Sequence, residues 1–135
     1  MRLEITRRAE LAVRALALLG ESPEHVKASA LAQQLGTTVL FVPQVLCPLV
    51  RAGWVRSDPG PTGGYRCLVS LTDVSVLQVI EAVEGATDMG RCVVADRPCT
   101  ADDVCVLHVA WTQARSELVD VLQSSPMSGV GGSVG

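Results

Sequence analysis

Apolar residues in the first half of the chain recur at helical spacing in three successive stretches. The first predicted helix covers residues 6–19. A second, shorter helix covers residues 27–36 and closes at Gly36, which suits a left-handed C-cap. Thr38 can then cap a third helix over residues 39–53. Two short helices joined by a tight turn after a longer one are the outline of a helix-turn-helix.

Two short strands are predicted next, within residues 54–71. Between them lies a turn rich in glycine and proline, flanked by Arg56 and Arg66. A helix-turn-helix followed by a basic hairpin is a winged helix, in which the recognition helix enters the major groove of DNA and the wing contacts the backbone or minor groove. The pattern therefore predicts a mainly α fold with a small β-hairpin wing, which we expect to bind double-stranded DNA.

Two further helices are predicted in the second half of the chain. The first, over residues 73–85, opens with a possible capping box of Ser75 and Gln78 and stops at Gly85. The second, over residues 104–123, carries a long apolar stripe with no core element nearby to cover it. We therefore expect this helix to pack against a second subunit and to make a homodimer.

These elements divide the chain into three regions. The winged helix-turn-helix occupies residues 1–70, and the cysteine loop (86–104) with the dimerisation helix occupies residues 71–124. The remaining residues, 125–135, are small and polar, and we predict a disordered tail there.

Composition adds few constraints. Four aromatic residues among 135 mean that the core is built from Leu, Val and Ala. No apolar run reaches the roughly 18 residues of a membrane span, and no cleavable signal is recognisable, so we expect a cytoplasmic protein without a membrane partner. Residues 1–66 carry eight basic and five acidic side chains, whereas residues 67–135 carry three basic and nine acidic ones. An anion such as DNA would therefore meet the N-terminal half.

Three of the five cysteines fall close together, at Cys92, Cys99 and Cys105, and His108 follows one helical turn later. An odd number of cysteines without a signal peptide argues against a secreted disulfide scaffold. Converging thiolates suit an iron–sulfur cluster, a Cys3His set also suits zinc, and a metal-free thiol pair can oxidise to a disulfide. No Ser-His-Asp set or Gly-rich phosphate loop is present, which argues against an enzyme.

Several stretches, in their order along the chain, resemble the Rrf-type transcription regulators of bacteria, the family of the iron–sulfur cluster regulator IscR and the nitric-oxide sensor NsrR. The matching stretches are MRLEITRRAELAVRAL, LAQQLGTTVLFVPQVLCPLVRAGWV and GPTGGYRCLVSLTDVSVLQVIEAVEG, followed by three cysteines before a long helix. The resemblance implies a homodimeric regulator of a roughly palindromic operator, in which an iron–sulfur cluster senses redox state, nitric oxide or iron supply. Some members lack the cluster and act through protein partners.

The resemblance also implies a set of cluster ligands: Cys92, Cys99 and Cys105, with a fourth ligand from one of two places. His108 matches the histidine of IscR-like members, which hold a 2Fe–2S cluster. Glu10 matches an acidic ligand that certain NsrR-like members supply from the partner subunit. We favour His108 over Glu10 and 2Fe–2S over 4Fe–4S. Six residues separate Cys92 from Cys99, where five are usual in the family.

The expected DNA surface has one unusual feature, since Pro43 and Pro48 both fall inside the predicted recognition helix. An internal proline costs about 3 kcal/mol and kinks or breaks a helix. Val39 and Leu40 offer bases no hydrogen bonds, so base reading is expected from Thr37, Thr38 and Gln44, with Gln44 suited to adenine. Phosphate contacts are expected from Arg2, Arg7, Arg51, Arg56 and Arg66. The wing is expected to contribute Gly63, Gly64 and Tyr65.

The alternative function is a cluster-free or zinc-binding dimer that acts through a protein partner.

Overall fold

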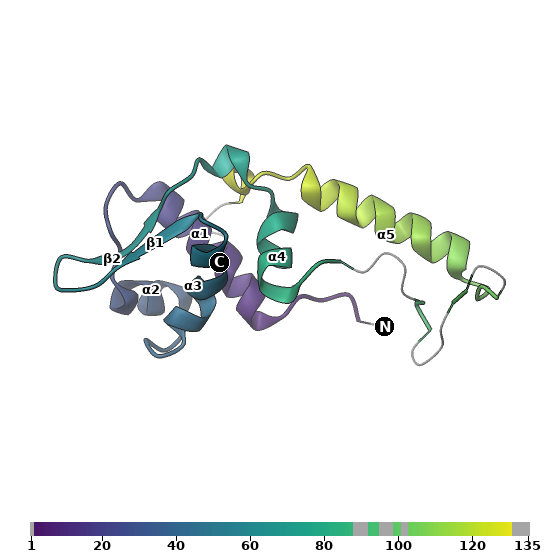
Figure 1. Ribbon diagram of the computed structural model, residues 1–135, viewed down its shortest axis with the longest axis horizontal. Coiled ribbons are helices and arrows are strands. Elements are labelled where there is room, and N and C mark those ends of the chain that lie inside the picture. Colours follow the sequence, from purple (N-terminus) through teal and green to yellow (C-terminus); the bar gives the residue numbers. More distant parts are fainter. Residues whose placement is uncertain (1, 88–91, 95–98, 101–102, 131–135) are drawn as a thin grey trace.

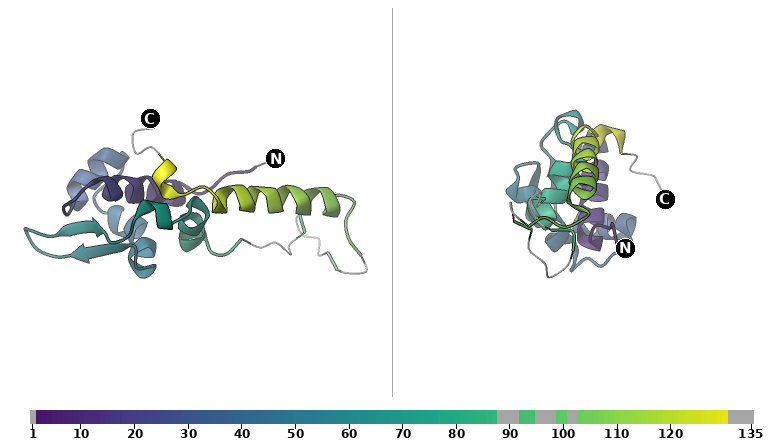
Figure 2. Two further views of the ribbon diagram at one scale, coloured as in Figure 1. Left: turned by 90° about the horizontal axis from the view of Figure 1, so that it is seen from above. Right: turned by 90° about the vertical axis from the view of Figure 1, so that its right-hand side faces the viewer.

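A computed structural model describes residues 2–87, 92–94, 99–100 and 103–130 of the chain. The elements, in chain order, are α1 (Arg7–Glu21), α2 (Ala28–Leu35), α3 (Val42–Arg51), β1 (Val55–Asp58), β2 (Gly64–Cys67), η1 (Leu71–Asp73), α4 (Val76–Glu84), α5 (His108–Gln123) and η2 (Met127–Gly129). The elements α1 to α4 and the hairpin gather at one end of the molecule, and α5 projects away from them (Figures 1 and 2). No described helix is long and apolar enough to cross a membrane.

The buried core lies between α1 and the elements packed around it. Seven residues of α1 are at most 1% exposed: Ala9, Leu11, Ala12, Ala15, Leu16, Ala17 and Leu19. The alanines among them let α1 approach α3 and α4 closely, and the core is completed by leucines and valines of α2, α3 and α4. The expectation of a core built from Leu, Val and Ala is therefore confirmed.

Nearby residues determine where the first three helices begin and end, and the sequence predicts only some of these positions. Thr6 caps α1, because its hydroxyl accepts the N–H of Ala9 at 3.1 Å. Gly36 ends α2 with a left-handed φ of +70°. The predicted start of the third helix is wrong: Thr38 accepts the N–H of Phe41 at 3.3 Å, but it closes a turn, and α3 begins at Val42.

The hairpin is attached to the helices through the segment before α2. Strands β1 and β2 pair antiparallel, with Val55 opposite Cys67 and Arg56 opposite Arg66. Tyr65 exchanges two backbone hydrogen bonds of 2.8 Å with Val26, outside the β1–β2 ladder. This pairing explains Gly64, because a Cβ there would lie 2.6 Å from the carbonyl oxygen of Val26.

The C-terminal half confirms the capping box and corrects two other predictions. Ser75 and Gln78 form both reciprocal bonds at the start of α4. Helix α5 begins at His108, four residues later than residue 104, where we expected it. The predicted disorder of residues 125–135 is wrong for 125–130, because Met127 is fully buried and its N–H donates to the carbonyl of Val74 at 2.7 Å. Residues 131–135 lie outside the described part of the chain.

Candidate metal centre and nucleic-acid interface

The three cysteines of the loop converge. The sulfur atoms of Cys92, Cys99 and Cys105 all lie within 4.8 Å of one another. Cys105 is 5% exposed, whereas Cys92 and Cys99 are half-buried. The Cys92 sulfur already accepts a hydrogen bond from the N–H of Val94 at 3.3 Å. Bonds of this kind stabilise a thiolate, which is the form that binds metals.

Short-range bonds position this cluster of thiols. Thr100 and Asp103 bind each other through their backbones at 3.2 and 3.3 Å, and the hydroxyl of Thr100 also accepts the N–H of Asp103 at 3.1 Å. The N–H of His108 donates to the carbonyl of Cys105 at 3.1 Å, so Cys105 is joined to the first turn of α5. The most buried of the three thiols is therefore held by the long helix.

The donor set fits a metal centre. Three soft sulfur donors that meet in a loop suit iron in a cluster. They also suit zinc, whose tetrahedral sites place sulfurs about 3.8 Å apart at a zinc–sulfur distance of about 2.3 Å. Three sulfur atoms within 4.8 Å of one another suit either centre, so the donors support a metal without selecting one.

Neither candidate for the fourth ligand belongs to this group within one chain. Among the described residues, the converging ligand atoms are the three thiols alone. His108 is half-buried at the start of α5. The roles of His108 and of Glu10 from a second subunit as the fourth ligand stay predictions.

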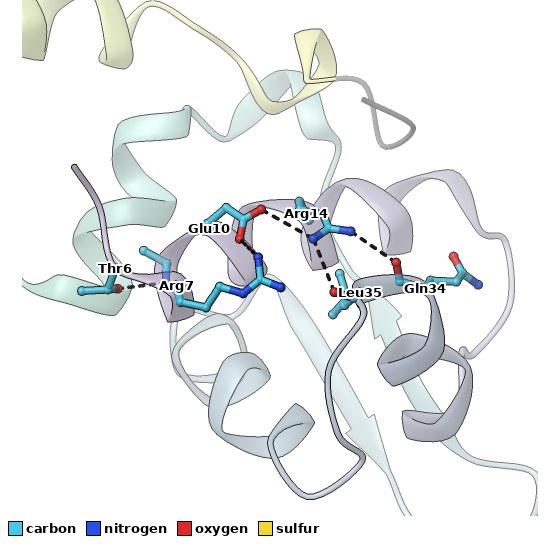
Figure 3. A network of polar contacts seen from close by, with 7 residues as sticks. Thr6, Arg7, Glu10, Arg14, Gln34 and Leu35 are labelled. Carbon is cyan, nitrogen blue, oxygen red and sulfur yellow. Dashed lines mark hydrogen bonds and ion pairs between the residues drawn. The ribbon is translucent and has the colours of Figure 1, made fainter. Parts of the chain in front are cut away.

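Glu10 has partners of its own within the chain. Its carboxylate lies 2.5 Å from Nη1 of Arg7 and 3.5 Å from Nη1 of Arg14 (Figure 3). Arg14 also donates to the carbonyls of Gln34 and Leu35 at 3.3 and 3.4 Å. These bonds satisfy free carbonyls at the C-terminus of α2. Glu10 is therefore connected, through Arg14, to the helix that precedes the turn of the helix-turn-helix.

The N-terminal segment lies against α5 and the cysteine loop instead of the helix-turn-helix. One surface hollow is lined in part by Arg2, Leu3, Cys92 and Trp111. A neighbouring hollow is lined by Leu3, Trp111 and Leu118, among others. Arg2, which we expected to contact phosphate, thus lies beside the candidate metal centre.

The turn before α3 and the outer face of α3 present the predicted base-reading residues. Thr38 and Gln44 are exposed and Thr37 is half-buried. Between them, Val39 is 50% exposed and Leu40 is 87% exposed. The surface that would face DNA therefore mixes hydrogen-bonding side chains with an apolar pair.

The two prolines do not break α3, contrary to our expectation. Pro43 lies in the first turn, where the missing N–H would have no helical partner in any case. Pro48 lies inside a helix that continues to Arg51. The carbonyl of Gln44 instead accepts Nε of Arg8 in α1, at 2.9 Å. Our sequence analysis missed Arg8, whose partner is 36 residues away and leaves no periodic signal.

The wing places two predicted phosphate contacts on one face, because Arg56 and Arg66 are directly opposite each other in the ladder. Nε of Arg56 lies 2.9 Å from Oδ1 of Asp58, and Nε2 of His25 lies 2.6 Å from Oδ2 of the same carboxylate. The hydrogen bond from His25, and then that from Arg56, lowers the pKa of Asp58 below its ordinary 3.8. Lys27 donates to the carbonyl of Pro61 and ties the wing turn to the start of α2.

The remaining predicted DNA contacts differ in burial. Arg7 and Arg51 are exposed, although Arg7 is paired with Glu10. Gly63 is buried, and a Cβ there would lie 2.1 Å from the carbonyl oxygen of Asp58. Tyr65 is half-buried and packs against the core. Gly63 and Tyr65 therefore shape the hairpin, and their contact with DNA stays a prediction.

Comparison with known proteins agrees with this geometry. The Azotobacter vinelandii protein ORF2 is 30% identical over 97 residues, which are 72% of this chain and 58% of that protein. The transcriptional regulator IscR of Vibrio vulnificus is 27% identical over 124 residues, covering 90% of this chain and 73% of that protein. CymR, the global cysteine regulator of B. subtilis, superposes with a TM-score of 0.75 at 20% identity, covering 93% of this chain and 94% of CymR.

The IscR structure from T. potens gives a TM-score of 0.72 at 22% identity over 93% of this chain and 84% of that one. These structures confirm the predicted winged-helix fold. The Rrf2 family model, described as an iron-dependent transcriptional regulator, matches residues 5–129. The relatives are regulators and not enzymes, as the sequence indicated. This chain belongs to the Rrf2 family of transcriptional regulators.

Proposed function

We propose that this chain is a cytoplasmic, homodimeric regulator that binds operator DNA and holds an iron–sulfur cluster on Cys92, Cys99 and Cys105. The observation that carries the proposal is the convergence of the three thiols within 4.8 Å at the start of α5. Such a cluster, when bound, supplies an iron centre whose state changes with redox conditions, nitric oxide or iron supply. The chain's own part is to hold the thiols and to connect them to the DNA-binding half.

The DNA-binding half is assigned to the turn before α3, to α3 itself and to the wing. Thr37, Thr38 and Gln44 read bases, and Arg51, Arg56 and Arg66 contact phosphates. Family membership supports this assignment, as does the excess of basic side chains in residues 1–66. Arg2 remains a proposed phosphate contact, although it lies beside Cys92 and not on the helix-turn-helix. Arg7 becomes available to phosphate only when it leaves Glu10.

The dimer is assigned to α5, whose apolar side chains lack cover. Leu118 is 51% exposed and Val121 is 62% exposed, and no residue of α5 is buried within the single chain. A second copy of α5 would cover these residues by the self-complementary contact that a twofold axis produces. A dimer is also what the alternative fourth ligand, Glu10 of the partner subunit, requires.

For the fourth ligand we favour His108 over the partner's Glu10, and with it a 2Fe–2S cluster over 4Fe–4S. His108 lies three residues after Cys105, and its N–H donates to the carbonyl of Cys105 at 3.1 Å, so its backbone already lies beside one of the thiols. Glu10 would first have to leave Arg7 and Arg14. The two ligands therefore differ in the free-energy cost of binding the cluster, because only Glu10 must break existing ion pairs.

The first test is an absorption spectrum with iron and sulfide analysis on protein purified without oxygen. About two irons per subunit would identify a 2Fe–2S cluster, and about four a 4Fe–4S cluster. Cys99→Ser should lose the cluster and remain a folded dimer. Cys67→Ser is the matched control, because Cys67 is half-buried in β2, away from the three loop cysteines, and its thiol donates to the carbonyl of Val69. Colourless protein after anaerobic reconstitution would contradict the cluster.

A second candidate function rests on the apolar pair in the turn before α3. Val39 and Leu40 offer bases no hydrogen bond and would suit a protein partner. In that case the chain is a zinc-binding or cluster-free dimer that regulates through a protein. A gel shift with the promoter DNA of its own gene separates the two. Binding that weakens steeply with salt indicates DNA, and absence of a shift in every metal state indicates the protein partner.

A further inference from the structure

Pro48 leaves one backbone carbonyl of α3 without its helical partner. In an α-helix the N–H of each residue donates to the carbonyl four residues earlier. Proline has no N–H, so Pro48 cannot donate to the carbonyl of Gln44. The helix nevertheless continues from Val42 to Arg51. The carbonyl at Gln44 therefore needs a donor from elsewhere, or water.

Arg8 supplies that donor. Its Nε lies 2.9 Å from the carbonyl oxygen of Gln44. Arg8 lies in the first turn of α1, and α1 packs directly against α3. The bond is charge-assisted, and such bonds are stronger than those between neutral groups. A cation from α1 thus replaces the hydrogen bond that the proline removes from α3.

We propose that Arg8 is a positioning residue for DNA recognition, which compensates for Pro48 and holds the backbone of Gln44 in its reading position. The inference rests on the proposed role of Gln44 as a base reader. Its physical basis is the geometry at one residue: Arg8 fixes the carbonyl of Gln44, and the side chain of Gln44 leaves the same residue on the exposed face of α3. A shift of this backbone moves the amide group that would bond a base.

A double-mutant cycle tests the compensation without DNA. Pro48→Ala restores an N–H that can donate to Gln44 and makes Arg8 dispensable. Arg8→Met should lower the melting temperature by about 3 °C or more in the natural sequence, and by less than about 1 °C beside Pro48→Ala. The lost charge is the same in both backgrounds and cancels in the comparison. Equal losses in both, or none in either, would overturn the compensation.

Selection from a DNA duplex library with a randomised central segment tests the positioning. Gln44→Ala identifies the base positions that Gln44 reads, because it removes the side chain and keeps the carbonyl. Arg8→Met should relax the preference at those same positions and weaken binding about tenfold, and Pro48→Ala should restore the preference in the double variant. A uniform loss at all positions, unrestored by Pro48→Ala, would make Arg8 a phosphate contact only and overturn the positioning role.

The two experiments separate this inference from the proposed function. If the natural protein enriches no sequence, DNA recognition through α3 fails and the positioning role fails with it, whereas the melting cycle still decides whether Arg8 compensates for Pro48. If the protein enriches a sequence and the cycle shows no coupling, the regulator binds DNA and the inference about Arg8 is wrong.

Discussion

The winged-helix half and the α5 half of the chain use their apolar side chains in opposite ways. In the first, α1 is surrounded by α2, α3 and α4, and Leu11, Leu16 and Leu19 are at most 1% exposed. In the second, α5 extends from the rest of the molecule with no buried residue (Figure 2). One half completes its core within a single chain. In the proposed dimer, the other half completes its packing against a second copy, so the two halves should respond differently to mutation.

The largest effect should come from a charge on the uncovered face of α5. Leu118→Asp would bury two carboxylates in a symmetric dimer, one from each subunit. Each uncompensated buried charge costs about 3–5 kcal/mol. We expect monomers in sedimentation analysis, with the helical circular dichroism of the winged half retained. Glu117→Gln, which changes a charge elsewhere on α5, is the control. A Leu118→Asp dimer of unchanged affinity would place the dimer interface elsewhere.

The next largest effect should come from the core around α1. Leu16→Ala deletes a fully buried side chain, and such deletions cost about 2–5 kcal/mol. Denaturant unfolding should show this loss in the free energy of unfolding. Val121→Ala should cost far less in the Leu118→Asp monomer, because Val121 is 62% exposed in one chain. Equal costs would remove the distinction between the two halves.

A smaller loss, about 2 kcal/mol, is expected for Met127→Ala. Met127 is fully buried, but it lies in η2, a single short turn that can relax into the space. The free energy of unfolding measures the loss, and Met127→Leu, which keeps the volume, should restore most of it. A neutral Met127→Ala would mean that residues 125–130 add little to the core.

The smallest effect concerns Asp58 on the wing. Its pKa is lowered by His25 and then Arg56, so the ionised carboxylate favours the folded state above its ordinary pKa of 3.8. This contribution disappears as the pH falls through the lowered pKa. Asp58→Asn should therefore melt slightly earlier than the natural protein at pH 7, and the difference should shrink on acidification below pH 3.8. Asp73→Asn, at an exposed aspartate, is the control for the loss of one carboxylate.

The sequence predicted correctly those features, in both halves, that depend on residues close together in the chain. Helical spacing located α1, α2, α4 and α5, and the capping box at Ser75 was correct to the residue. The three cysteines could be named from their chemistry. These features depend on neighbours in the chain, and local patterns record them directly.

Two of the errors come from contacts between distant residues. Residues 125–130 have the composition of a flexible tail, but one methionine fills the core and the backbone pairs with Val74 and Val76. Composition averages over a segment and gives no weight to one well-placed side chain. The proline in α3 looked like a break because its compensating donor, Arg8, comes from another helix. The start of α3 was misplaced because Thr38 caps a turn as readily as a helix.

The backbone bonds around Ser125 and Met127 also have a mechanical consequence. The N–H of Val76 donates to the carbonyl of Ser125 at 2.8 Å, and Met127 pairs with Val74, so the C-terminal end of α5 is fastened to the start of α4. The other end, about 24 Å away along 16 residues of helix, begins at His108, whose N–H holds Cys105. Helix α5 is thus a lever with its fulcrum on the winged half. A tilt of about 5° at the fulcrum moves the far end of α5 by about 2 Å over that length, next to Cys105.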